Sequence, residues 1–80
     1  MQLVIIKMQA RNTKALQVQE VLTKHGCEIT VRLGIHEQAE GECSPEGVII
    51  LQVKPNAKAI KSLLADLKAV GQLKVKDISI

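Results

Sequence analysis

The sequence predicts an α+β protein in which four antiparallel strands carry two helices on one face of the sheet. Four apolar runs are rich in β-branched residues or alternate with polar ones, which is typical of strands. Two other segments repeat their apolar residues at helical spacing. The resulting order, β-α-β-β-α-β, is that of the ferredoxin-like fold, whose right-handed crossovers put both helices on the same side.

The first half of the chain predicts a strand, a helix and a strand. Leu3–Met8 is rich in β-branched residues and opens the chain as a strand. Asn12 and Thr13 offer side-chain oxygens that can cap the helix that follows, and Gly26 can end it. From Cys27 the pattern changes to alternation, which predicts a half-buried strand.

The alternation also predicts which side chains of this second strand share a face. One set is apolar and is expected to point toward the helices: Ile29, Val31, Leu33 and Ile35. The other set is expected on the open face of the sheet: Glu28, Thr30, Arg32, Gly34 and His36.

The second half of the chain supplies the remaining three elements. Val48–Val53 is almost continuously apolar, which predicts a central strand buried on both faces. Asn56 can cap a helix whose apolar stripe runs to Val70, and Gly71 can end that helix. Leu73–Ile80 then predicts the last strand.

The chain is short and its core is aliphatic. Its 80 residues predict one ferredoxin-like domain over positions 1–80, and the composition is 46% hydrophobic with no Phe, Tyr or Trp. A domain of this size buries little apolar surface, and the uncovered face of the sheet is expected to show aliphatic groups. We therefore predict a homo-oligomer, a dimer or a tetramer.

The charge is unevenly distributed along the sequence. The formal net charge is +3, but four of the eight acids fall in the loop between the second and third strands: Glu37, Glu40, Glu42 and Glu46. The rest of the chain is therefore strongly basic. Its basic residues are dispersed and no aromatic side chain can stack on bases, so direct nucleic-acid binding is not expected.

The two cysteines and the apolar runs indicate the compartment. Cys27 and Cys43 are predicted to be reduced, with Cys27 packed as a small apolar side chain. The runs Leu3–Ile6 and Val48–Leu51 are too short to cross a bilayer, and no signal peptide precedes them. We predict a cytoplasmic protein that does not contact membranes.

No catalytic constellation is found in the sequence. It has no Walker loop, no identifiable Ser-His-Asp set and no paired carboxylates on one element. Arg11 follows the first strand without the glycine-rich loop that would cradle a phosphate, and no Cys-x-x-Cys is present. We predict that the protein is not an enzyme and has no catalytic residues, and the sequence leaves any cofactor unknown.

Two passages of the sequence resemble a known family. KHGCEITVRLGIHE runs from the first helix into the second strand, and CSPEGVIILQV leads into the third. They are similar to the iron-only hydrogenase system regulators, with Arg32–His36 and Cys43–Gly47 as the most specific pieces. The resemblance covers nearly the whole chain. It implies an ACT-like fold, similar to the C-terminal domain of nickel-responsive repressors, and a role in the maturation or regulation of [FeFe] hydrogenase.

The resemblance also indicates where a ligand would bind. ACT domains often hold small effectors between subunits, and the nickel-responsive repressors use His residues late in the second strand and a Cys soon after. His36 and Cys43 resemble two of these metal ligands, while Gly34 stands where another His would be needed. Since a closed metal site normally needs four ligands, a second subunit would have to complete it.

These observations lead to two candidate functions. The first is a small non-enzymatic regulatory domain that binds a small-molecule ligand or a protein partner as a homo-oligomer. Its predicted ligand-binding residues are Arg32, Gly34, His36 and Glu37. The alternative is a metal-binding sensor or carrier that uses His36 and Cys43 at a subunit interface.

Overall fold

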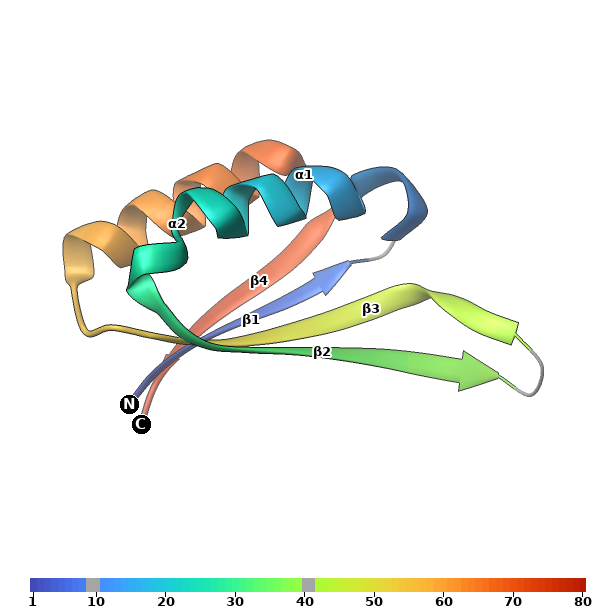
Figure 1. Ribbon diagram of the computed structural model, residues 1–80, viewed down its shortest axis with the longest axis horizontal. Helices are drawn as coiled ribbons and strands as arrows, with labels where there is room; N and C mark the ends of the chain where they lie inside the picture. Colours follow the sequence, from blue (N-terminus) through green and yellow to red (C-terminus); the bar gives the residue numbers. More distant parts are fainter. Residues whose placement is uncertain (9–10, 40–41) are drawn as a thin grey trace.

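A computed structural model describes residues 1–8, 11–39 and 42–80 and confirms the predicted ferredoxin-like fold (Figure 1). Its elements are β1 (Gln2–Met8), α1 (Arg11–Lys24), the 3-10 turn η1 (Gly26–Glu28), β2 (Ile29–Ala39), β3 (Glu42–Val53), α2 (Ala57–Val70) and β4 (Leu73–Ser79). The strand order is β2-β3-β1-β4, with every neighbouring pair antiparallel. Both helices lie on one face of the sheet, and the other face is left uncovered (Figure 1).

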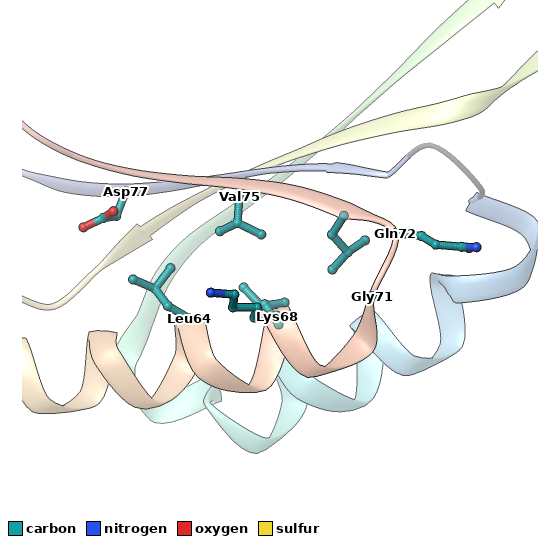
Figure 2. A pocket seen from close by; sticks show the side chains of 8 residues that line it. Leu64, Lys68, Gly71, Gln72, Val75 and Asp77 are labelled. Carbon is teal, nitrogen blue, oxygen red and sulfur yellow. The ribbon is translucent and has the colours of Figure 1, made fainter.

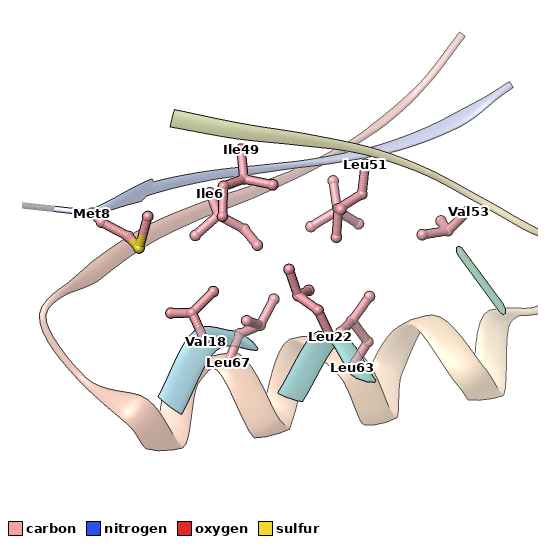
Figure 3. Close-up of a cluster of buried hydrophobic side chains, with 10 residues drawn as sticks. Ile6, Met8, Val18, Leu22, Ile49, Leu51, Val53, Leu63 and Leu67 are labelled. Carbon is pink, nitrogen blue, oxygen red and sulfur yellow. The ribbon is translucent and has the colours of Figure 1, made fainter. Parts of the chain in front are cut away.

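The hydrophobic core lies between the sheet and the two helices (Figure 3). It is aliphatic throughout, as the composition predicts, and its buried residues are Val4, Ile6, Met8, Val18, Leu22, Ile49, Leu51, Val53, Leu63 and Leu67. On β1 and β3 these are alternate residues, because successive side chains of a strand point to opposite faces. The residues between them on these two strands therefore lie on the open face.

The predicted ends of α2 are confirmed and the predicted start of α1 is not. Asn56 caps α2 by accepting a hydrogen bond from the Ala59 backbone N–H at 3.1 Å. Gly71 ends it, with its N–H donating to the Lys68 carbonyl at 3.2 Å. α1 begins at Arg11, so Asn12 and Thr13 lie inside the helix, whereas a capping residue stands before the first helical one.

A polar contact joins the end of α1 to the middle of α2. His25 Nε2 lies 2.7 Å from Asp66 Oδ2, and Lys24 Nζ donates to the same oxygen at 3.0 Å. The His25 side chain is only 9% exposed, so burial and this bond hold it in place. The Asp66 carboxylate therefore links the two helices. It pairs with the Lys24 ammonium and gives the buried His25 ring nitrogen a hydrogen-bond partner.

Replacing Asp66 with Asn should weaken the fold at neutral pH and make it less sensitive to acid. The hydrogen bond with His25 and then that with Lys24 hold the pKa of the Asp66 carboxyl below its ordinary 3.8. Such a group contributes stability above its unfolded pKa, and this is lost as the pH falls through the lowered folded pKa. Urea midpoints of wild type and Asp66→Asn should therefore differ at pH 7 and converge as the pH falls through the lowered pKa of the Asp66 carboxyl. A difference that stayed constant through the acid range would contradict this.

An irregularity at Thr30 sets the faces of β2 and overturns the predicted ones. Ile29 pairs with Val53, but Val31 pairs with Gln52, so one extra residue stands on β2 between them. Thr30 Oγ1 donates to the Gln52 carbonyl at 3.1 Å and fixes this bulge. Because strand side chains alternate, one inserted residue moves every following side chain to the other face. The open face therefore receives Val31, Leu33 and Ile35, which are 51%, 53% and 43% exposed.

The third strand is central, as predicted, but only one of its faces is covered. β3 lies between β2 and β1 in the sheet. Its helix-facing residues Ile49, Leu51 and Val53 are buried, whereas Val48 and Ile50 are half-buried on the open face. The continuous apolar run thus reflects a core on one side and an exposed aliphatic surface on the other.

Candidate functional site

The uncovered side of the sheet is the most distinctive surface of the described structure. The register aligns its residues in three rows that cross β2, β3, β1 and β4 in that order. The rows are Val31-Gln52-Leu3-Ile78, Leu33-Ile50-Ile5-Lys76 and Ile35-Val48-Lys7-Lys74. We call these twelve positions the open face. Eight of them are aliphatic and none is acidic, so the surface combines apolar area with positive charge.

The positive charge is confined to one corner of the open face. Lys7, Lys74 and Lys76 lie together on β1 and β4, whereas β2 contributes only aliphatic side chains and β3 two aliphatics and Gln52. A contiguous apolar area bordered by charged side chains is typical of a surface that another molecule covers.

The structure places the predicted ligand residues Arg32 and Gly34 on the helix-facing side of β2. Arg32 pairs with the buried Leu51, and its Nη2 donates to Oε1 of Gln19 on α1. Gly34 pairs with Ile49, and a Cβ built there would meet nothing within 4 Å. Their predicted position on the open face is therefore wrong, because the bulge at Thr30 reverses the alternation. Their role in binding a ligand stays a prediction.

The other predicted site residues are placed through their backbone. His36 pairs with Gly47, and Cys43 pairs with Gln38 two positions further along β2. The side chains of positions 36 to 46, including His36, Glu37 and Cys43, lie outside the described part of the structure. Among the described side chains no group of three His, Cys, Asp or Glu could hold a metal ion. The metal site at His36 and Cys43 stays a prediction.

The two cysteines lie far apart in the fold, one just before β2 and the other on β3 opposite the far end of β2. Cys27 lies in η1 and is exposed, not packed as predicted, because the turn projects it away from the core. Cys43 pairs with Gln38, nine positions beyond Ile29. At about 3.3 Å per strand residue these ends are roughly 30 Å apart, whereas a disulfide needs Cα atoms within about 7 Å. The two thiols of one chain therefore cannot form a disulfide in this fold.

Several pockets open on the helix side of the sheet, and two of them lie at the ends of the helices. One, of about 450 Å³, lies between α2 and β4 and has aliphatic walls that include Leu64 and Val75 (Figure 2). Lys68 on the helix and Asp77 on the strand give it one ammonium and one carboxylate. The other, of about 380 Å³, lies where α1 leads into β2 and includes Arg32. Both are large enough for part of a small molecule and carry charged groups that could orient it.

The described helices show no membrane span. Neither helix within the ranges that the structure describes is long and apolar enough to cross a bilayer.

The fold and this surface define a ferredoxin-like α+β domain with one uncovered sheet face, and solved structures share that fold. The uncharacterized protein TM1266 from Thermotoga maritima superposes with a TM-score of 0.77 at 22% identity, over 96% of this chain and 91% of that one. The periplasmic divalent cation tolerance protein CutA from Archaeoglobus fulgidus gives 0.54 at 15% identity, over 100% and 84%. CPII, a nitrogen regulatory PII-like protein from Thiomonas intermedia K12, bound to ADP, AMP and bicarbonate, gives 0.54 at 17%, over 99% and 89%.

These likenesses show the fold and no more. No protein-family description matches the sequence, and no curated protein is similar to it. Membership of the iron-only hydrogenase system regulators therefore stays an expectation that rests on the two sequence passages.

Proposed function

We propose that this protein is a small non-catalytic regulatory domain that works as a homo-oligomer and binds a ligand or a protein partner. The observation that carries the proposal is the open face, with eight aliphatic positions that neither helix covers. Small soluble domains rarely leave a contiguous apolar surface of this kind exposed unless another molecule covers it. Covering it would also strengthen a fold whose buried core, among the described residues, consists of Val, Ile and Leu side chains and Met8.

Two further observations support a small-molecule effector. The pocket between α2 and β4 combines aliphatic walls with an ammonium and a carboxylate, a pattern that can orient a small ionic molecule. The similar PII-like protein CPII is bound to ADP, AMP and bicarbonate, so in that protein the fold serves a regulatory role with small ligands. The sequence resemblance adds [FeFe] hydrogenase maturation or regulation as the process in which this domain would act.

The proposal is tested by mass spectrometry of the protein purified from its own host. Under native conditions we expect an assembly of two or more chains that also retains a ligand, a metal ion or a protein partner. The same sample after denaturation should give the mass of the single chain. A native spectrum that shows one chain with nothing bound, at tens of micromolar protein, would exclude the proposed function.

A further inference from the structure

We propose that the pocket between α2 and β4 binds a small zwitterion with an aliphatic body, whose carboxylate pairs with Lys68 and whose ammonium pairs with Asp77. The inference rests on the proposed function, in which the domain binds a ligand. It adds the place where the ligand binds, its chemical class and the two side chains that select it. It follows from the register of β4 and from two charges that have no partner within the described structure.

Asp77 lies at a position of β4 where an apolar side chain would be expected. Directly opposite residues of an antiparallel pair share a face of the sheet. Asp77 pairs with Val4, which is 0% exposed on the helix side, so the Asp77 side chain lies on the helix side as well. The preceding β4 residues on this face, Leu73 and Val75, are aliphatic and pack against the core. A carboxylate in this series adds nothing to the core and is available for a polar contact.

Lys68 gives the facing wall of the pocket a positive charge. It lies on α2 four positions after Leu64, and residues four apart share a helix face. Figure 2 shows its side chain extending toward the end of the pocket where Leu64 and Asp77 lie. The ammonium and the carboxylate thus border one pocket from opposite elements, the helix α2 and the edge strand β4.

Neither charge is neutralised by another side chain within the described ranges. The Lys68 ammonium and the Asp77 carboxylate form no hydrogen bond or ion pair with each other or with any other described residue. Asp66 on the same helix differs, because its carboxylate bonds both His25 and Lys24. One molecule that carries both a carboxylate and an ammonium can pair the two free charges of the pocket at once.

These charges select the class of ligand. An anion would be attracted by Lys68 and repelled by Asp77, and a cation would meet the reverse, whereas a zwitterion is attracted by both. An aliphatic body suits the half-buried Leu64, Leu73 and Val75, which a ligand would remove from water. The volume of about 450 Å³ lies in the lower part of the range of small-molecule sites, about 300–1,000 Å³. An aliphatic amino acid and a dipeptide both fit this description.

A neighbouring pocket separates the roles of two lysines on α2. It has about 310 Å³, shares Leu64 and Asp77 with the first pocket and is bordered by Lys61 in place of Lys68. Lys61 and Lys68 are seven positions apart, which is about 10 Å along the helix axis. A ligand held by Asp77 and Lys68 leaves Lys61 unused, whereas a diffuse attraction to the basic helix would involve both lysines equally.

The first test compares probes that share one aliphatic body. Two zwitterions, L-leucine and the dipeptide alanyl-leucine, are titrated into the isotope-labelled full chain, and the backbone amide shifts report both the dissociation constant and the place of binding. Isocaproate keeps the leucine body without its ammonium, and isoamylamine keeps it without its carboxylate. We expect at least one zwitterion to bind about tenfold or more tightly than either singly charged probe, with the shifts concentrated in Leu64–Asp77. The tighter zwitterion shows whether the pocket prefers the amino acid or the dipeptide.

The second test removes one charge at a time. Lys68→Gln and Asp77→Asn should each weaken zwitterion binding about three- to tenfold. Lys68→Gln should also remove the preference for leucine over isoamylamine, and Asp77→Asn the preference over isocaproate. Lys61→Gln is the matched control, because it removes the same charge from the same helix, and we expect a change within about twofold. Circular dichroism should show all three variants folded, since these side chains are exposed and have no partner in the described structure.

The outcomes separate this inference from the proposed function. The zwitterion site is wrong if both zwitterions bind no more tightly than the singly charged probes, or if Lys61→Gln weakens binding as much as Lys68→Gln. The proposed function then still stands if native mass spectrometry shows an assembly with another ligand or a protein partner. A chain that is monomeric and retains nothing in that spectrum, but binds a zwitterion in this pocket, keeps the inference and removes the proposed function.

Discussion

Replacing Leu67 with Ala should lower the free energy of unfolding by about 3 kcal/mol, a large part of the roughly 5–15 kcal/mol that stabilises a small domain. Leu67 lies on α2 with its side chain 0% exposed, inside the cluster that joins the helices to the sheet (Figure 3). The truncation removes buried methyl groups and leaves a cavity, and both the lost burial and the cavity destabilise the fold.

The control for this prediction is Leu16→Ala. The same chemical change is made on α1, but Leu16 is 71% exposed and is not part of the core. Ala is also a good helix former, so we expect a change within about 0.5 kcal/mol. Urea unfolding followed by circular dichroism gives both values, at one protein concentration so that self-association affects them alike. Similar losses in the two variants would mean that Leu67 is not part of the core.

The order of elements could be read from the sequence because it depends on local patterns. The period of the apolar residues differs between helix and strand, and the signals at Asn56 and Gly71 act within one turn of backbone. The sequence misplaces the start of α1 because several neighbouring polar residues can serve as caps. The contact of His25 with Asp66 could not be predicted, because 41 positions separate the two residues and only the packing of α1 on α2 brings them together.

The predicted orientation of the β2 side chains is wrong, and the structure shows the reason. Alternation alone assigns Val31, Leu33 and Ile35 to the core, since nothing in the local pattern marks Thr30 as an inserted residue. The bulge becomes visible only through the register with β3 and the bond of the Thr30 hydroxyl to the Gln52 carbonyl. β2 is also an edge strand, where α1 gives little cover and the Arg32 side chain reaches Gln19 instead. The apolar residues that alternation assigns to the core therefore lie on the open face.

Replacing Gly71 with Ala should also destabilise the fold, by about 1–3 kcal/mol, although no atom stands in the way of the added methyl group. Gly71 ends α2 with φ 80° and ψ 161°, a backbone conformation that essentially only glycine adopts. The next residue, Gln72, already has a positive φ of 59°, so the turn into β4 contains two such residues in succession. An alanine at Gly71 must either adopt the strained conformation or shift the turn and with it the start of β4.

Gly34 provides the matched control for that substitution, because it separates space from backbone conformation. A Cβ at Gly34 would also meet nothing within 4 Å, but Gly34 lies in a regular part of β2 without a positive φ. Gly34→Ala should therefore be neutral or stabilise the protein by up to about 1 kcal/mol, since it restricts the unfolded chain. The free energies of unfolding of the two variants, from urea titrations, should change in opposite directions or differ by at least about 1 kcal/mol. If Gly71→Ala were as harmless as Gly34→Ala, the turn after α2 would not need glycine, and the exact end of that helix would not control the register of β4.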